Sequence, residues 1–337
     1  MGWSKGSWTD WMTETLHEQF TLQEFQTNGI RVRAAVEGTG PLVILVHGWP
    51  ELWYSWRHQI KPLAAAGYRV VAPDVRGYSG SDKPHAIEAY DMATIMADVV
   101  GLIDALGEQQ AILVGHDWGA PIVWNTAALH PTRVRAVAGL SVPYRKRLEI
   151  STIALWHKLF AGKFFYQLYF QEEGVAEAEL EADVRTALAK IYYGASGDAP
   201  TLEGWMNRPP DGDLLSGFAT PAPLPAWLTE ADLDYFEANF AAGGFRGPLN
   251  RYRCQQRDFD DLPEMGALPI KQPSCFIAGA KDLVRAFVHP TDPYADVAAH
   301  CNDFRGKTII DGIGHWVQQE APDEVNAALL SFLATLG

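Results

Sequence analysis

Short, nearly continuous apolar runs alternate with longer amphipathic segments along the first part of the chain. The runs have the length of buried strands and lie at 42–46, 68–73, 110–115 and 134–140. Apolar residues at helical spacing follow in 53–64, 92–106 and 120–130, while 21–34 shows the alternation of two earlier strands. This order predicts an α/β fold with a mostly parallel, doubly wound sheet, whose active site lies at the carboxyl ends of the strands.

The pattern changes in the middle of the chain. Residues 145–266 are rich in aromatic residues, Ala and Glu, show helical periods and proline clusters, and carry no strand pattern. Strand patterns resume at 274–278 and 307–310, and an amphipathic helix is expected at 324–336. We therefore predict a core formed by 1–143 and 267–337, with 1–20 as an N-terminal extension and 144–266 as an inserted helical lid.

Asp117 is the candidate nucleophile. It follows the apolar run of 110–115, lies between Gly115 and Gly119, and precedes a predicted helix, which is the layout of a nucleophile elbow. A hydroxyl that attacked an sp³ carbon would leave an ether, whereas a carboxylate leaves an ester that water can hydrolyse. The pattern therefore predicts displacement at an alkyl carbon. A plain turn, with Asp117 capping the next helix, is the structural alternative.

An ester on Asp117 needs a base to activate water, and His315 is the candidate. It follows the predicted strand 307–310 among small residues, whereas most of the other histidines have helical, loop or surface contexts. Asp282, just after the strand 274–278, is the candidate acceptor for the second ring nitrogen of this histidine. The order Asp117, Asp282, His315 matches the nucleophile, acid, histidine order of α/β hydrolases.

The segment His47-Gly48-Trp49-Pro50 also follows a strand and is the candidate for part of an oxyanion hole. In this layout the backbone N–H groups of Trp49 and Trp118 would bind the oxyanion. Gly48 permits close approach of the backbone, and Pro50 indicates a fixed bond for which the cis form is open. The alternative for this segment is an ordinary turn.

The composition argues against some classes of binding partner and favours others. The 337 residues carry a formal net charge of -14, with Lys and Arg scattered, which argues against nucleic acid and anionic membranes and favours small, neutral, apolar substrates. The sequence contains no apolar stretch long enough to span a membrane and no signal-peptide pattern. The three cysteines are widely spaced and are not arranged as metal ligands, so we expect no metal site and a reducing, cytoplasmic location. We also expect no cofactor.

The N-terminal extension is expected to place Trp8, Trp11, Met12 and Leu16 on one helix face that packs on the core.

From residue 25 to the C-terminus the chain resembles the soluble epoxide hydrolases of the α/β-hydrolase family. The resemblance rests on several strings, which are His-Gly-Trp-Pro-Glu at 47–51, Arg-Gly-Tyr-Ser-Gly-Ser at 76–81, Gly-His-Asp-Trp-Gly at 115–119, Tyr-Gln-Leu-Tyr-Phe-Gln at 166–171, Gly-Phe-Arg-Gly-Pro-Leu-Asn at 244–250 and Gly-His-Trp at 314–316. It implies that the lid tyrosines Tyr166 and Tyr252 polarise an epoxide oxygen, and that Gln167 and Trp118 also contact substrate. Tyr169 is expected to pack rather than react.

Two departures from the family pattern and two rival functions stay open. Ser79 stands where glycine is more frequent, and Arg251 stands where the vertebrate enzymes have an aromatic residue, which would alter a wall of the pocket or its charge. A haloalkane dehalogenase would use the same aspartate, but many have Asn in the place of Trp49, and fluoroacetate dehalogenases have Arg in the place of Trp118. A non-catalytic binder of apolar ligands is the other rival. A monomer and a homodimer are both open.

Overall fold

The computed structural model describes residues 16–288 and 290–337. Its main sheet has eight strands in the order β1-β2-β4-β3-β5-β6-β9-β10. β1, β2 and β4 pair antiparallel, and every pair from β4 to β10 is parallel. The strands are β1 (Thr21–Thr27), β2 (Ile30–Glu37), β3 (Leu42–Val46), β4 (Arg69–Pro73), β5 (Ala111–His116), β6 (Val134–Leu140), β9 (Ile270–Gly279) and β10 (Cys301–Ile310). The predicted, mostly parallel α/β-hydrolase sheet is therefore confirmed.

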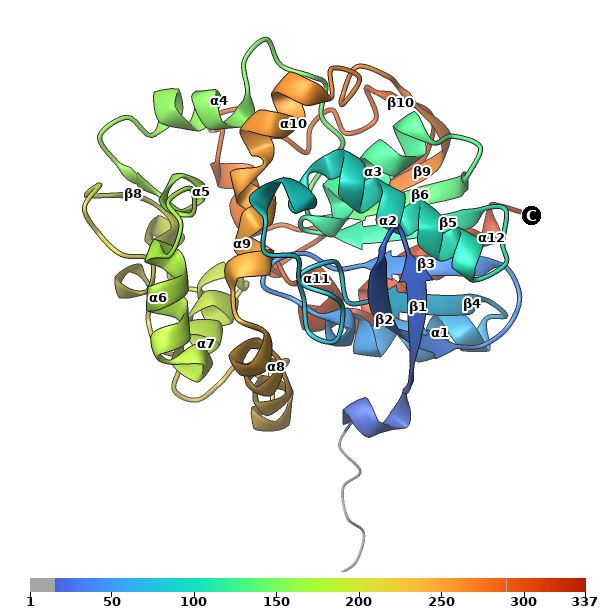
Figure 1. The fold of residues 1–337 in the computed structure, drawn as a ribbon, viewed down its shortest axis with the longest axis horizontal. Helices are drawn as coiled ribbons and strands as arrows, with labels where there is room; N and C mark the ends of the chain where they lie inside the picture. The colour runs from blue at the N-terminus through green and yellow to red at the C-terminus, as the bar shows by residue number, and fades with distance from the viewer. Residues whose placement is uncertain (1–15, 289) are drawn as a thin grey trace, which may run out of the picture.

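Helices flank this sheet. α2 packs on α3 and β1, and α3 packs on β5 and β6, while α1 and α12 pack against each other and against other strands (Figure 1). The flanking helices are η1 (Leu16–Gln19), η2 (Trp53–Trp56), α1 (Arg57–Ala65), η3 (Ile87–Tyr90), α2 (Met92–Ala105), α3 (Gly119–Leu129), η6 (Leu283–Ala286), α11 (Val317–Glu320) and α12 (Pro322–Ala334). β3 and β5 are buried along their whole length, which explains their continuous apolar runs.

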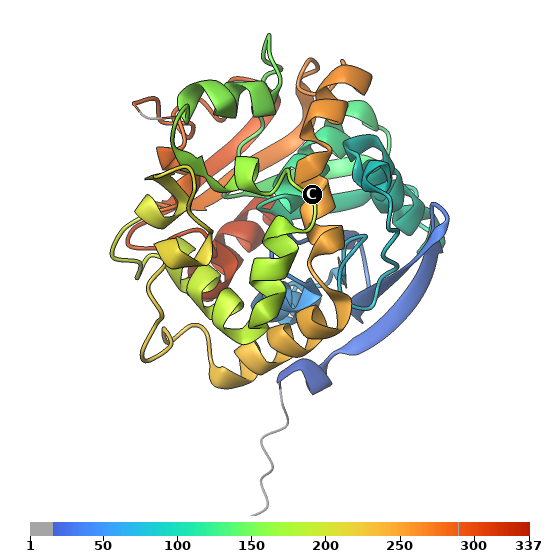
Figure 2. The same cartoon turned by 60° about the vertical axis from the view of Figure 1, so that its left-hand side comes forward.

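The inserted segment between β6 and β9 lies to one side of the sheet (Figures 1 and 2). It contains α4 (Thr152–Leu159), α5 (Tyr166–Tyr169), α6 (Val175–Ala182), α7 (Val184–Ala195), η4 (Glu203–Trp205), η5 (Leu215–Gly217), α8 (Glu230–Gly243), α9 (Arg246–Arg253) and α10 (Gln255–Asp261). The prediction that it holds no strand was wrong. β7 (Phe164–Phe165) and β8 (Met206–Arg208) form a small antiparallel pair, too short to produce an alternating pattern in the sequence.

Two predicted strands are longer than expected, for reasons visible in their burial. β9 begins at Ile270 rather than 274, because exposed Lys271 and partly exposed Pro273 interrupt its apolar pattern. β10 begins at Cys301 rather than 307, and as an edge strand it leaves every residue at least partly exposed. Most of the helix expected around Trp8, Trp11 and Met12 lies outside the described residues. Within the part of the chain that the structure describes, no helix is long and apolar enough to cross a membrane.

Candidate active site

The central strands end at a common edge of the sheet. Val46 of β3 pairs with Gly115 of β5, and Leu140 of β6 pairs with both His116 of β5 and Ile277 of β9. Because these strands are parallel, the loops that follow them meet at this edge. Those loops carry the predicted oxyanion segment, the nucleophile and the acid.

The turn after β5 has the backbone of a nucleophile elbow. Asp117 has a positive φ of 49°, a conformation that few residues other than glycine adopt. A Cβ on Gly119 would lie 2.0 Å from the carbonyl oxygen of Val46, and one on Gly115 would lie 2.1 Å from that of Gly119. A side chain at either position would clash with these carbonyl oxygens, so the tight turn requires glycine at both.

His315 lies within contact distance of both acids of the predicted triad. Nε2 of His315 is 3.3 Å from Oδ2 of Asp117, and Nδ1 is 3.0 Å from Oδ1 of Asp282. Burial by itself lowers the pKa of His315, but the charges of Asp282 and Asp117 and hydrogen bonds to both raise it well above its usual value. Burial opposes ionisation of Asp282, yet His315 and the Val284 N–H hold the pKa of this carboxyl below its usual range.

The oxyanion segment also contacts the nucleophile. The N–H of Trp49 donates to Oδ1 of Asp117 at 2.7 Å, and the Trp49–Pro50 bond is cis. A Cβ on Gly48 would lie 2.3 Å from the same oxygen, so only glycine fits there. Trp118 is the N-cap residue of α3, and its N–H as the second oxyanion donor stays a prediction.

Both ring nitrogens of His47 lie at hydrogen-bond distance from backbone groups. Its Nε2 accepts from the N–H of Val75 at 2.9 Å, and its Nδ1 lies 2.9 Å from the carbonyl oxygen of Gly48. Burial lowers the pKa of His47, so the ring stays neutral, with the proton on Nδ1 donated to Gly48. Both ring nitrogens thus bind backbone groups, and the assignment of His47 to the motif rather than to the chemistry stays a prediction.

A buried pair that the sequence reasoning missed links three loops of the site. Glu51 lies 2.7 Å from Nδ1 of His116 and accepts from the N–H of Gly48, while Nε2 of His116 lies 2.7 Å from the carbonyl oxygen of His315. Burial by itself raises the pKa of Glu51, but the charge and hydrogen bond of His116 lower it to about 2. Because both ring nitrogens of His116 face acceptors, both act as donors, as in an imidazolium ion.

The signal for this pair was present in the sequence. Glu51 directly follows the predicted oxyanion segment, and His116 directly precedes Asp117. The missing information was their distance in space, which only the pairing of β3 with β5 provides.

Glu320 of α11 is a second missed residue. Its Oε2 accepts from the N–H groups of Gly314 and Gly197 at 2.9 and 2.8 Å, and its Oε1 accepts from that of Trp316 at 3.0 Å. Burial raises its pKa to about 7 against the opposing effect of these three donors. Glu320 thus holds both neighbours of His315 and joins the base loop to the inserted segment.

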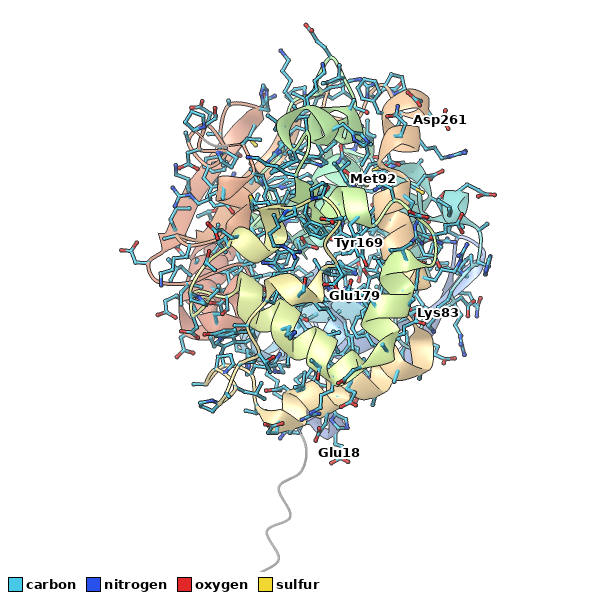
Figure 3. The ribbon with its side chains drawn as sticks, turned by 90° about the vertical axis from the view of Figure 1, so that its left-hand side faces the viewer. Glu18, Lys83, Met92, Tyr169, Glu179 and Asp261 are labelled. Atoms are coloured by element: carbon cyan, nitrogen blue, oxygen red, sulfur yellow. The ribbon has the colours of Figure 1, made fainter. Side chains whose placement is uncertain are left out.

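A cavity of about 220 Å³ opens beside Asp117. Apolar and aromatic side chains form much of its wall, including Trp118, Trp124, Leu155, Trp156, Val284 and Phe287, and Met92 of its wall is labelled in Figure 3. The predicted substrate residues Tyr166 and Gln167 also line it. Such a wall fits the apolar part of a small ligand.

The two predicted lid tyrosines pack against each other, and the charge of Asp117 acts on both. The ring centroids of Tyr166 and Tyr252 are 6.0 Å apart, and Tyr252 packs edge-on against Trp118 at 5.2 Å. Burial, followed by the negative charge of Asp117, raises the pKa of Tyr166. Burial raises the pKa of Tyr252 well above its usual value too. Both phenols therefore keep their protons and can act as hydrogen-bond donors.

Gln167 orients the first of these tyrosines. Its Nε2 donates to the hydroxyl oxygen of Tyr166 at 2.9 Å, while its Oε1 accepts from Trp156 Nε1 at 2.9 Å and Gln255 Nε2 at 3.2 Å. With an N–H directed at its oxygen, the Tyr166 hydroxyl keeps its own proton for another acceptor. No pattern in the sequence pointed to Trp156 or Gln255.

The two departures and the third tyrosine now have structural explanations. Arg251 is buried, forms an ion pair with Asp258, and lies over the ring of Trp118 at 5.0 Å, so it neutralises an acid of the cavity wall. Ser79 has a positive φ of 44°, which explains the preference for glycine there. Tyr169 donates to Glu179 at 2.8 Å and is not part of the cavity wall (Figure 3).

Among residues 16–288 and 290–337, no group of three or more His, Cys, Asp or Glu side chains is arranged to hold a metal ion. Asp117 lies beside His315, which contacts its acid partner Asp282, and the protonated phenols of Tyr166 and Tyr252 are within electrostatic range of Asp117.

Comparisons with known proteins agree with this geometry. A family model of the alpha/beta hydrolase fold matches residues 41–322. Epoxide hydrolase A of Mycobacterium tuberculosis is 46% identical over 314 residues, covering 92% of this chain and 96% of that protein. The epoxide hydrolase of Caballeronia sordidicola is 38% identical, covering 93% of each chain. The crystal structure of Epoxide Hydrolase A from Mycobacterium thermoresistibile covers 94% of this chain and 98% of its own, with 43% identity and a TM-score of 0.88. The chain therefore belongs to the α/β-hydrolase family and, within it, to the epoxide hydrolases.

Proposed function

We propose that Asp117 opens an epoxide by attacking one of its carbons. The observation that carries this proposal is the different environment of its two carboxylate oxygens. Oδ1 accepts the Trp49 N–H, whereas Oδ2 lies 3.3 Å from His315, and Asp117 lines the cavity. Attack by Oδ2 breaks the C–O bond of the epoxide and leaves Oδ1 as the carbonyl oxygen of a hydroxyalkyl ester.

The departing epoxide oxygen needs proton donors, and Tyr166 and Tyr252 are suited to supply them. Both are buried, have raised pKa values and lie on the inserted segment. We assign residues 144–266 as a lid whose function is to hold these two phenols over the nucleophile. An alkoxide leaving group explains the two tyrosines, whereas a halide leaving group would not require them.

His315 would then activate the water that cleaves the ester. Esterification removes the negative charge of Asp117, which is one of the causes of the raised pKa of His315. The pKa of this histidine should therefore fall once the ester forms, and the ring becomes a base when one is needed. Asp282 stabilises the resulting imidazolium, and the N–H groups of Trp49 and Trp118 bind the tetrahedral oxyanion.

The substrate is a small epoxide with a largely apolar body, and its product is a vicinal diol. The wall of Trp, Leu, Val and Phe side chains around Asp117 supports this assignment. No cofactor takes part in either step of the proposed reaction, because water is its second substrate.

The experiment that tests the covalent step replaces His315 with Gln. The variant should form the ester with styrene oxide but fail to cleave it, so mass spectrometry should find the substrate mass on the peptide that contains Asp117. The double variant that also carries Asp117→Asn is the control and should remain unmodified. A variant that binds styrene oxide without forming an adduct would contradict the scheme, and chloride release from chloroalkanes without epoxide turnover would favour the dehalogenase.

A further inference from the structure

The direction of the Tyr166 hydroxyl depends on a chain of hydrogen bonds that begins at Trp156. The indole Nε1 of Trp156 can only donate, so the atom 2.9 Å from it must be an acceptor, which is Oε1 of Gln167. Nε2 of Gln255 lies 3.2 Å from the same oxygen and is a second donor to it. With its oxygen occupied by two donors, the amide of Gln167 turns its Nε2 toward the Tyr166 oxygen.

This chain joins three helices of the inserted segment. Trp156 lies on α4, Tyr166 and Gln167 begin α5, and Gln255 begins α10. All four side chains are buried, from 2% exposed for Trp156 to 9% for Gln167, and all line the cavity. A reversed Gln167 amide would point its N–H groups at two other donors, and buried donors without acceptors cost free energy. The surroundings therefore select one of the two amide orientations.

The backbone beside this amide is held as well. Nε2 of Gln171 donates to the carbonyl oxygen of Gln167 at 2.7 Å and to that of Tyr252 at 3.2 Å. One amide thus links the backbones of α5 and α9, which carry the two phenols. The freedom left to Gln167 is rotation of its side chain, and this is the freedom that Trp156 and Gln255 restrict.

We propose that Trp156 and Gln255 are positioning residues for Tyr166, which act by fixing the amide of Gln167. In the observed orientation, Gln167 donates to the Tyr166 oxygen, and the phenol keeps its proton for the epoxide oxygen. In the reversed orientation, Oε1 of Gln167 would accept that proton and withhold it from the reaction. The inference rests on the proposed function, because it concerns the proton that Tyr166 supplies there.

The same hydrogen bond also affects the acidity of the phenol. Burial and the charge of Asp117 raise the pKa of Tyr166, and the hydrogen bond from Gln167 opposes them. An N–H that faces the oxygen stabilises the negative charge that develops there as the proton leaves. The orientation of Gln167 therefore favours both the direction and the transfer of the proton.

Two substitutions of Gln167 test the role of its orientation. Gln167→Met removes the donor and should slow ester formation with styrene oxide by about 10-fold. Gln167→Glu keeps the shape but places a carboxylate at the phenol, which accepts its proton, so the loss should reach about 100-fold when the new carboxyl is ionised. Rapid quenching and mass spectrometry of the peptide that contains Asp117 measure the rate.

The pH profile separates this effect from a change in packing. A protonated carboxyl can donate to Tyr166 as the amide does, so the rate of Gln167→Glu relative to Gln167→Met should rise as the pH falls from about 9 to 5. Cleavage of the ester, which needs no proton from Tyr166, should stay within about 2-fold of the wild type in both variants. Parallel profiles for the two variants, or equal slowing of both chemical steps, would overturn the inference.

A double-mutant cycle tests the two positioning residues. Gln255→Met and Trp156→Phe should each slow ester formation by about 3- to 10-fold in the wild-type background, and neither should slow it further in Gln167→Met. An equal loss in both backgrounds would overturn the inference, because these residues would then act on the fold or on the shape of the cavity. Gln256→Met, at the exposed next position of α10, removes hydrogen bonds with Ser151 and Asp260 and should leave the rate within about 2-fold.

Failure of the inference and failure of the proposed function give different results. If Tyr166→Phe slows ester formation but Gln167→Glu and Gln167→Met behave alike, the inference fails and the proposed function stands. If the wild-type enzyme does not turn over styrene oxide, or if Tyr166→Phe forms the ester at the wild-type rate, the proposed function of this site fails and the inference fails with it.

Discussion

At the scale of single residues, the charged groups of the site shift one another's pKa values. Asp117 and Asp282 lie on opposite nitrogens of His315 and together raise its pKa, while its imidazolium lowers that of Asp282. The chemistry proposed for the ester depends on this coupling, because removing one charge changes the proton affinity of the ring. Burial and the charge of Asp117 also raise the pKa of Tyr166, so its phenol stays protonated.

The coupling predicts the effect of Asp117→Asn on His315. The variant removes a negative charge next to Nε2, so the pKa of His315 should fall, as measured by NMR of the ring protons between pH 5 and 10. The ion pair stabilises the fold below the unfolded pKa of about 6.5, and this contribution is lost as the pH rises through the higher folded pKa. The difference in unfolding free energy between wild type and variant should shrink over that range, and a pKa that does not move would contradict the assignment.

The two tyrosines of α5 provide a test substitution and a matched control. Tyr166→Phe removes a proposed donor to the alkoxide and should lower the rate of ester formation by roughly 100-fold or more, measured by stopped-flow tryptophan fluorescence. Tyr169→Phe, three residues along the same short helix, removes only the hydrogen bond to Glu179. It should cost about 1 kcal/mol of stability and leave the rate within about 2-fold. Similar rates for the two variants would argue against a role for Tyr166.

At the scale of elements, the position of His315 depends on the packing of α11 rather than on its own strand. Glu320 is the last residue of this helix. Its carboxylate accepts from the N–H groups of the two residues that flank His315 and from that of Gly197, which follows α7 in the chain. One carboxylate thus fixes the base loop relative to the lid. Since His315 is needed only after the ester has formed, an error in its position should slow the second chemical step selectively.

Glu320→Gln tests this arrangement. An amide cannot accept all three N–H groups, so ester hydrolysis should slow by about 10-fold or more while ester formation changes little. The ester on Asp117 should then accumulate at steady state, which rapid quenching and mass spectrometry would detect. Glu324→Gln, at an exposed position of α12, is the matched control and should behave as the wild type. Equal slowing of both steps would assign Glu320 to general stability instead.

At the scale of the whole molecule, buried polar links join the lid to the core. Arg57 of α1 pairs with Asp232 of α8 at 3.0 Å, and Tyr54 donates to the same aspartate at 2.8 Å. The hydroxyl of Tyr192 in α7 donates to the carbonyl oxygen of Pro50, the last residue of the oxyanion segment. Unpairing any of these groups would leave a polar atom buried, so lid and core should unfold together in a single transition.

The pair of Glu51 and His116 should contribute most to this stability. Glu51→Gln leaves a buried histidine without its counter-ion and should cost about 3–5 kcal/mol, measured by urea unfolding at pH 7. The folded pKa of Glu51 is about 2 against an ordinary value of 4.5, so its contribution is present above pH 4.5 and is lost as the pH falls toward 2. Glu24→Gln, which removes an exposed ion pair with Arg31, should cost less than about 1 kcal/mol. Equal losses would contradict the assigned role.

The sequence by itself determined the order of the strands and helices, and through it the sheet. Continuous apolar runs such as 42–46 must be buried on both faces, and Asp117 and Asp282 each follow a strand that is buried at its end, while His315 follows the edge strand β10. These features are local, so they can be read from neighbouring residues. The lid was recognisable only as a helical region, and its small β7–β8 pair was missed because so few residues form it.

Only the tertiary structure decided which residues distant in sequence share the site. Glu51 and His116 lie 65 residues apart and meet because β3 pairs with β5. Glu320 is in hydrogen-bond contact with Gly197, 123 residues away. Arg251 is recognisable as the partner of Asp258 only when the neighbours of its guanidinium are known. Charge pairing and desolvation depend on distances in space, and a residue pattern along the chain does not contain them.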